Sequence, residues 1–237
     1  MQYPATSQSS RISEIFSSIQ GEGIHFGERH LFIRFEECHI HCTYCDELEK
    51  PGQWLTLNDV VGKVLEMDRE EGPHSYVSLT GGEPLLYVNF LKPLMMQLKA
   101  HRFHTYLETN GILWKALEEV IGWCDCIAMD MKPASVTKEK NFDEDHFRFL
   151  EIANSKNTFV KIVVSKDIDI NEFENEIRIV SSINQKIPVI LMPISTEREG
   201  HEDPYLLQVM LHLQRVGLKY VNCVRIIPRF HKIMNLR

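Results

Sequence analysis

Residues 30–45 read HLFIRFEECHIHCTYC, an apolar run that leads into three cysteines, Cys38, Cys42 and Cys45, within eight residues. The run 30–35 predicts a buried strand because it is short, mostly apolar and followed by polar residues. Cysteines this close together cannot all pair with one another, so they do not indicate a disulfide framework. The spacing C-x3-C-x2-C instead lets one tight loop direct three sulfurs at a single metal centre.

Two kinds of metal centre fit this loop. Zinc would take a fourth protein ligand from His39 or His41 and form a Cys3His site. A [4Fe–4S] cluster would bind the three cysteines through three irons and leave the fourth iron open. The spacing alone leaves both centres open. The other cysteines, Cys124, Cys126 and Cys223, stand among apolar residues and are predicted to pack in the core.

Outward from this stretch, short apolar runs alternate with segments of helical periodicity. The runs predicted as strands are His30–Phe35, Tyr76–Leu79, Thr105–Glu108, Cys126–Met129, Phe159–Val164, Val189–Met192 and Val224–Ile227. The predicted helices are Leu57–Asp68, Asn89–His101, Ala116–Gly122, Asp143–Asn154, Ile170–Ile183 and Pro204–Arg215. Thr56 or Asn58 is expected to cap the first helix.

Repeated strand–helix units predict a parallel sheet covered by helices, closed either as a doubly wound sheet or as a full or partial barrel. We expect one domain over residues 1–237, because no repeat or Pro/Gly-rich linker divides the chain. In either architecture the active site lies at the carboxyl ends of the strands. Polar, Gly or Pro residues occupy those ends at 80–84, 108–111 and 130–133, so the cysteine loop is expected at the mouth of the sheet.

The amino-acid composition indicates an ordinary folded domain and argues against several kinds of partner. The chain has 237 residues, of which 43% are hydrophobic and 25% charged, and its formal net charge is −7. These are values of an ordinary folded domain. Without a Lys/Arg block, neither nucleic acid nor an anionic membrane is an expected partner. The longest apolar run, 187–194, is too short to span a bilayer, and the start lacks the order of a signal peptide, so we expect a cytoplasmic protein.

Two motifs in sequence order resemble the radical S-adenosylmethionine superfamily: the cysteine triplet, and LTGGEP at 79–84 after the next predicted strand. The resemblance implies a partial (β/α) barrel of about six parallel strands with incomplete helical cover. It also implies a [4Fe–4S] cluster on Cys38, Cys42 and Cys45, with S-adenosylmethionine on the open iron.

The same resemblance suggests which residues bind S-adenosylmethionine. The strand end Gly81-Gly82-Glu83 would hold the amino group, since glycines permit close approach of the backbone and Glu83 offers acceptors to an ammonium. Tyr44 would pack near the adenine. Asn110 would face the ribose or methionine part, and Lys132 matches a further polar position at a strand end.

The chain is also similar to the family of 7-carboxy-7-deazaguanine synthases. The similarity is carried by EIFSSIQGEG at 14–23, by Arg34, by Cys45-Asp46 and by RIIPRFHK at 225–232. It implies conversion of 6-carboxy-5,6,7,8-tetrahydropterin to 7-carboxy-7-deazaguanine with loss of ammonia. The similarity also implies that Mg2+ assists the reaction, that a protein such as flavodoxin or ferredoxin donates the electron, and that the chain forms a homodimer.

Four residues are candidates for binding the pterin substrate in this family. Gln20 and Glu22 match residues that hydrogen-bond the pterin edge, a task that suits an amide and a carboxylate. Arg34, near a strand end beside the cysteines, can fork onto a carboxylate. His231 lies in a locally basic tail that could attract an anionic substrate.

The sequence departs from the family at two points. Glu37 stands before Cys38, where the family usually has Gly, and a residue with a side chain can adopt fewer backbone conformations than glycine. Glu47 replaces a usual Thr or Ser after Cys45-Asp46, where the hydroxyl binds Mg2+; the Glu47 carboxylate is a hard oxygen ligand that could serve instead. Two alternatives to this function are a glycyl-radical-enzyme activase and a non-enzymatic Cys3His zinc-binding or cluster-binding module.

Overall fold

The computed structural model describes residues 9–45, 51–194 and 204–228. These residues form a nine-stranded sheet in the order β3-β1-β2-β4-β5-β6-β7-β8-β9. The strands are β1 (Ser9–Ile19), β2 (Arg29–Phe35), β3 (Gln53–Thr56), β4 (Tyr76–Gly81), β5 (His104–Thr109), β6 (Cys126–Met131), β7 (Asn157–Val164), β8 (Val189–Pro193) and β9 (Val224–Ile226).

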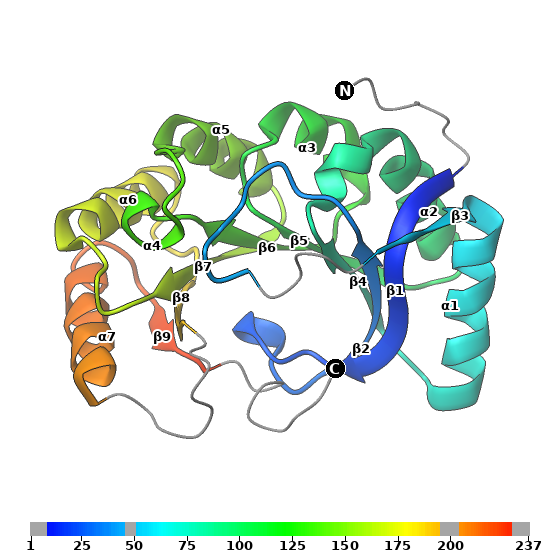
Figure 1. Cartoon of the computed structure of the whole chain (residues 1–237), viewed down its shortest axis with the longest axis horizontal. Coiled ribbons are helices and arrows are strands. Elements are labelled where there is room, and N and C mark those ends of the chain that lie inside the picture. Colours follow the sequence, from blue (N-terminus) through cyan, green and yellow to red (C-terminus); the bar gives the residue numbers. More distant parts are fainter. Residues whose placement is uncertain (1–8, 46–50, 195–203, 229–237) are drawn as a thin grey trace.

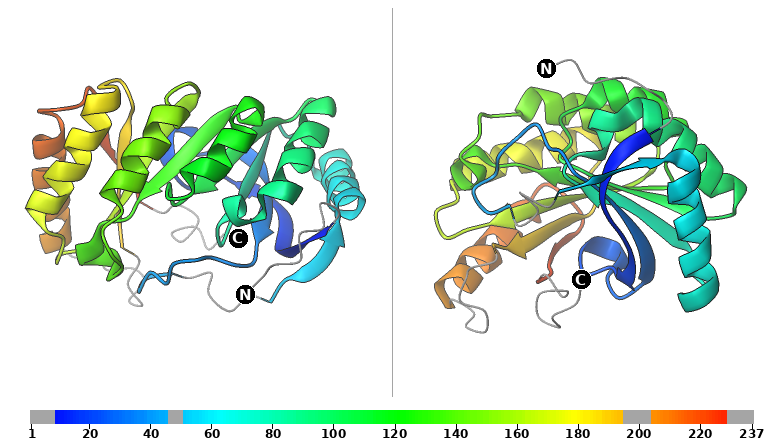
Figure 2. Two further views of the ribbon diagram at one scale, coloured as in Figure 1. Left: turned by 90° about the horizontal axis from the view of Figure 1, so that it is seen from above. Right: turned by 45° about the vertical axis from the view of Figure 1, so that its right-hand side comes forward.

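Seven of the strands, β2 and β4 to β9, are parallel, whereas β1 pairs antiparallel with β2 and β3 antiparallel with β1. The sheet curves into an open barrel with helices along its outer side, from α1 at one end to α7 at the other (Figure 1). Figure 2 shows the same curvature from two further directions. The predicted partial barrel of parallel strands is thus confirmed.

The helices are α1 (Leu57–Glu71), α2 (Val88–Ala100), α3 (Trp114–Val120), α4 (Ala134–Thr137), α5 (Asp143–Ala153), α6 (Ile170–Ile183) and α7 (Pro204–Gly217). The described residues also form three 3-10 turns, η1 (Gly23–His25) between β1 and β2, η2 (Pro84–Tyr87) before α2, and η3 (Ile121–Trp123) after α3. All seven predicted strands and all six predicted helices are present, with ends that differ by at most three residues. Thr56 caps α1 through a capping box with Asp59. Among the described helices, none is long and apolar enough to cross a membrane.

Strands β1 and β3 were not predicted. Strand β1 contains five serines, and of its side chains only Ser10, Ile12 and Phe16 are buried. Strand β3 is a four-residue edge strand with no fully buried residue. Both lie at the antiparallel edge of the sheet, where one face is open to solvent and the apolar runs typical of parallel strands are not needed.

The pleat of the parallel strands separates an apolar outer face from a polar inner face. On β2, Leu31 and Ile33 are fully buried in the core that the helices cover. Arg34, on the alternate face, pairs in register with Thr80 of β4. In the same way Asp130 of β6 pairs with Lys161 of β7. Since residues on one face of a strand recur at every second position, polar side chains at these alternate positions gather inside the barrel.

The cysteines outside the triplet follow the prediction in two cases of three. Cys124 and Cys126 are fully buried. Cys223 is only half-buried, which corrects the expectation of core packing. It lies in the turn before β9, where its backbone carbonyl accepts a hydrogen bond from the amide of Val189 at 2.9 Å. This backbone hydrogen bond joins the turn to β8.

Candidate active site

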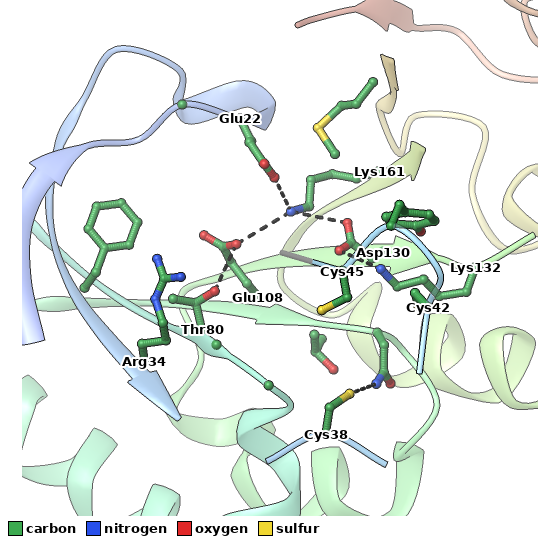
Figure 3. Close-up of a pocket in the computed structure, with 18 of the residues that line it drawn as sticks. Glu22, Arg34, Cys38, Cys42, Cys45, Thr80, Glu108, Asp130, Lys132 and Lys161 are labelled. Atoms are coloured by element: carbon green, nitrogen blue, oxygen red, sulfur yellow. Dashed lines mark hydrogen bonds and ion pairs between the residues drawn. The ribbon is translucent and has the colours of Figure 1, made fainter. Parts of the chain in front are cut away.

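A pocket opens at the carboxyl ends of the strands, beside the cysteine loop (Figure 3). It contains most of the residues predicted for the site: Gln20, Glu22, Arg34, Cys38, Cys42, Tyr44, Cys45, Gly81, Gly82, Asn110 and Lys132. Glu83 is not among the lining residues. Glu47 and His231 lie outside the described residues.

Two glycines at the end of β4 allow the start of the cysteine loop to pack directly on that strand. The amide of Gly82 donates to the carbonyl of Phe35 at 2.9 Å, and the amide of Glu83 donates to the carbonyl of Glu37 at 2.7 Å. A Cβ atom on Gly81 would lie 2.3 Å from the Phe35 oxygen, and one on Gly82 only 2.1 Å from the Glu37 oxygen. Gly81 also has a φ of +113°, which side chains rarely adopt. Both positions therefore require glycine.

The far end of the cysteine loop is held by the segment at α4. The amide of His41 donates to the Glu139 carboxylate at 2.7 Å, and the amide of Thr43 donates to the carbonyl of Thr137 at 3.3 Å. In Figure 1 the loop after β2 reaches across the ends of the neighbouring strands. Anchored on β4 at one side and at α4 on the other, the loop brings its three cysteines to the pocket.

The sulfurs of the cysteine loop are not spaced as a single zinc ion requires. A tetrahedral zinc site with Zn–S bonds of about 2.3 Å requires sulfurs about 3.8 Å apart. In the described part of the chain, no three ligand atoms that include Cys38, Cys42 or Cys45 lie within 4.8 Å of one another, and His39 and His41 do not complete such a set. The side-chain amide of Asn110 lies 3.9 Å from the Cys38 sulfur, in position to donate to it. These residues fit a larger polynuclear centre.

The glycine contacts lead to a prediction about cluster retention. Gly82→Ala should displace the cysteine loop, because the added methyl group meets backbone rather than a flexible side chain. We expect the anaerobically reconstituted variant to bind much less iron per chain than the wild type. Iron and sulfide assays, with circular dichroism to verify folding, measure the effect.

Gly62→Ala is the matched control, because Gly62 lies inside α1 with no neighbouring atom within 4 Å of a built Cβ. Alanine there should retain the iron and stabilise the helix by roughly 0.5–1 kcal/mol. Full iron retention in Gly82→Ala would show that the loop does not depend on this contact.

Glu83 lies beneath the end of β4, behind the two glycines. Its carboxylate is fully buried, and both of its oxygens accept hydrogen bonds from the protein. Oε1 accepts from the amide of Leu85 (3.1 Å) and the hydroxyl of Thr109 (2.9 Å), and Oε2 accepts from the amide of Asn110 (2.8 Å). Burial raises the pKa of Glu83 to about 7 against these hydrogen bonds. Through these hydrogen bonds Glu83 ties the end of β4 to the end of β5.

A lysine inside the barrel connects the acidic residues of the pocket. Lys161 of β7 is 2% exposed, and its ammonium lies 2.8 Å from Glu22, 3.2 Å from Asp130 and 3.6 Å from Glu108. Asp130 also contacts Lys132 at 3.2 Å. Figure 3 shows Lys161 at the centre of this group, with the cysteines beside it. A buried cation thus joins three strands to the segment that follows β1.

The opposite charges of Lys161 and Asp130 each stabilise the charged form of the other residue. Burial alone would lower the pKa of Lys161, but Asp130, Glu22 and Glu108 hold it above its ordinary value. Burial would raise the pKa of Asp130, but Lys132 and Lys161 hold it below its ordinary value. Burial raises the pKa of Glu108 despite Lys161. Lys161 is therefore a cation and Asp130 an anion at neutral pH.

Gln20 and Arg34 complete the polar lining on the side of β1 and β2. The Gln20 side chain donates to Glu108 at 2.9 Å and accepts from the amide of Glu22 at 3.1 Å. The guanidinium of Arg34 lies 5.3 Å from the centre of the Phe16 ring and 3.9 Å from the Glu14 carboxylate. The predicted pair Gln20 and Glu22 thus lies in the same hydrogen-bonded group as Lys161.

Sequence reasoning missed four members of this site: Thr80, Glu108, Asp130 and Lys161. The first three stood in strand ends that were identified as site-forming, but no role was assigned to them. Lys161 left a clearer signal, because it is the only charged residue within the predicted strand 159–164. A lone lysine in a buried strand must be paired, which marks it as a candidate.

Lys161→Met tests the buried cation, because methionine keeps a long unbranched side chain but removes the charge. The carboxylates would then face one another without compensation, and we expect the free energy of unfolding to fall by about 3–5 kcal/mol at pH 7. The difference from the wild type should shrink towards pH 5. In the variant the raised carboxylate pKa values make the folded state bind more protons than the unfolded state, so stability rises as the pH falls.

Urea denaturation at the two pH values measures both effects. Lys166→Met is the control at an exposed position next to the same strand, and it should change stability by less than about 0.5 kcal/mol. A loss for Lys161→Met that is small, or that does not depend on pH, contradicts the account of the network.

Comparison with known proteins shows the family to which the chain belongs. A model of the Radical SAM superfamily matches residues 32–180, and the chain is a member of that superfamily. It is 35% identical to 7-carboxy-7-deazaguanine synthase of Geobacter sulfurreducens, over 94% of this chain and 96% of that protein. With the protein of the same name from Archaeoglobus fulgidus the identity is 31%, over 94% and 97%. The chain therefore belongs to the 7-carboxy-7-deazaguanine synthase family.

Solved structures show the same fold. QueE from Escherichia coli superposes with a TM-score of 0.62 at 19% identity, over 94% of this chain and 95% of that chain. TYW1 with a lysine–pyruvate adduct superposes with a TM-score of 0.59 at 17% identity, over 81% and 74%. The predicted family and fold are confirmed, and the chain is an enzyme rather than a non-enzymatic metal-binding module.

Proposed function

We propose that the chain converts 6-carboxy-5,6,7,8-tetrahydropterin to 7-carboxy-7-deazaguanine with loss of ammonia. Family membership supports the reaction. The observation that carries the proposal for this site is the shared pocket: Gln20 and Glu22, from the segment after β1, face the same space as the cysteine loop. A pterin bound to the first group would therefore lie next to a cofactor bound at the second.

We assign the cluster to Cys38, Cys42 and Cys45. When bound, the reduced cluster and S-adenosylmethionine supply a radical that removes a hydrogen atom from the substrate. The protein's share is to hold the three thiolates in one loop and to direct the Asn110 amide at the Cys38 sulfur.

S-adenosylmethionine would lie along the end of β4 and the ring of Tyr44. Gly81 and Gly82 line the pocket there and present their backbone to it. The Lys132 ammonium lies 5.7 Å from the centre of the Tyr44 ring and fixes that side of the pocket. Glu83 acts as a positioning residue beneath it, through its hydrogen bonds to β5.

The pterin would bind to the polar group around Lys161. Its aminopyrimidinone edge presents N–H donors, which Glu22 and Glu108 can accept, while the amide of Gln20 can serve either role. Arg34, which lines the same pocket, would bind the substrate carboxylate by a forked contact. Because the carboxylates are already held by Lys161, little reorganisation is needed on binding.

Turnover by the reconstituted enzyme with the carboxylated tetrahydropterin, under anaerobic conditions, tests the function. Wild type should form 7-carboxy-7-deazaguanine and ammonia. Glu22→Gln keeps the shape but removes the charge, and we expect kcat/KM to fall by about tenfold to a hundredfold with cluster content and S-adenosylmethionine affinity unchanged. Product identification by mass spectrometry and initial rates provide the readout.

Glu118→Gln, at an exposed position on α3, is the matched control and should leave kcat/KM unchanged. Formation of 5′-deoxyadenosine without any deazaguanine product would refute the assigned substrate. Equal kinetics for Glu22→Gln and wild type would remove Glu22 from the substrate site.

Further parts of the proposal rest on the family resemblance. We place Mg2+ at Glu47 and a contact to the substrate at His231, both outside the described residues. Flavodoxin or ferredoxin would supply the electron. A homodimer is the proposed assembly, and the exposed leucines Leu207, Leu211 and Leu218, on and just after α7, provide an apolar surface for it.

A further inference from the structure

A second group of ligand-type side chains lies inside the barrel, at the end opposite the cysteine loop. The turn η1 enters the barrel there, and its Gly23 packs so closely on Phe159 of β7 that an added Cβ would lie 2.3 Å from the ring. His25 of this turn and His30 at the start of β2 face each other, with Glu28 between them in sequence. None of these three residues belongs to the pocket described above.

The three side chains form the tightest ligand group in the described part of the chain. One ligand atom from each of His25, Glu28 and His30 lies within 4.8 Å of the other two. The Glu28 carboxylate is 2.9 Å from Nδ1 of His25 and 3.7 Å from Nε2 of His30. Bonds of about 2.0–2.2 Å from one zinc ion to imidazole nitrogen and carboxylate oxygen require ligand atoms at such separations.

Hydrogen bonds among the described residues leave one ring nitrogen of each histidine without a partner. The His30 side chain is completely buried, yet its Nε2 has no hydrogen-bond partner among the described residues, because the contact to Glu28 is too long. Nε2 of His25 is likewise buried without a partner in the same part of the structure. Buried polar nitrogens are rarely left without a partner, so the His30 nitrogen that points toward Glu28 indicates a missing ligand.

The surroundings hold both imidazoles in place. Nδ1 of His30 lies 2.8 Å from the Ser78 hydroxyl, which can accept the Nδ1–H and so leave the lone pair on Nε2. The His30 ring stacks on Tyr76, with centroids 5.0 Å apart, and the His25 ring meets the edge of Tyr106 at 5.4 Å.

We propose that His25, Glu28 and His30 form a second metal site, which binds a divalent transition-metal ion, Zn2+ by its His2Glu ligand set. The site shares no residue with the cysteine loop or with the lining of the pocket. Glu28 is exposed at the rim, so the ion can enter from solvent and keep a water molecule as its fourth ligand.

The site would clamp the segment that carries the proposed substrate residues. The carbonyl of Glu28 accepts from the amide of Gln20 at 2.8 Å, and the carbonyl of Gln20 accepts from Gly27 at 2.9 Å, which closes residues 20–28 into one loop. A metal bound to His25, Glu28 and His30 links this loop to β2. Metal binding should therefore stabilise the loop from which Gln20 and Glu22 enter the pocket.

Zinc titration of the cluster-loaded protein tests the proposal. Wild type should bind about one zinc ion per chain in addition to its iron, measured by metal analysis after dialysis and by calorimetry. Zinc-edge X-ray absorption should show only nitrogen and oxygen ligands at about 2.0–2.1 Å, without the sulfur shell at about 2.3 Å that binding to vacant cysteines would give.

His25→Gln and Glu28→Gln should each weaken zinc binding at least about tenfold, and Ser78→Ala should weaken it by a similar factor through His30. Glu28 is exposed, so its variant is expected to fold, and circular dichroism verifies this. His104→Gln is the matched control: His104 lies near the same tyrosine, 5.3 Å from Tyr76, but outside the group, and it should bind zinc as the wild type does. No zinc beyond background, a sulfur shell, or undiminished affinity in either ligand variant overturns the proposal.

Discussion

A lysine that cannot reach solvent imposes the main constraint on this barrel. Lys161 is 2% exposed, and an unpaired ammonium at that position would carry a large desolvation cost. Its partners come from β5, β6 and the segment after β1, so the charge is compensated only when these elements meet in one register. The same carboxylates form one wall of the pocket. The ion pairs of Lys161 require polar residues inside the barrel, and the carboxylates of those pairs also supply the pocket with hydrogen-bond acceptors.

The other wall depends on backbone packing rather than on charge. Gly81 and Gly82 let the cysteine loop lie directly on β4, and Glu83 joins the ends of β4 and β5 from below. The familiar sequence of glycines and a glutamate is therefore explained here mainly by contacts within the protein. The Glu83 side chain holds together the strand ends that line the pocket.

The sequence predicted the parallel strands well because they are buried on both faces and so appear as apolar runs between turn residues. It did not predict β1 and β3, whose half-exposed faces leave only a weak alternation such as that of Ile12 and Phe16. The sequence predicted those pocket residues that stand at strand ends or within a recognisable motif. Lys161 was missed because it lies inside a strand, and its partners Glu22 and Asp130 are 139 and 31 residues distant in sequence, so that only the folded register reveals them.

The central claim is that the group around Lys161 presents a pterin to chemistry that begins at the cysteine loop. The most direct test uses 6-carboxy-5,6,7,8-tetrahydropterin deuterated at C6, turned over anaerobically by the reconstituted wild-type enzyme. The account predicts deuterium in 5′-deoxyadenosine or in the re-formed S-adenosylmethionine, because the C6 hydrogen must lie against the bound cofactor. Product formation with no deuterium in either molecule would contradict it.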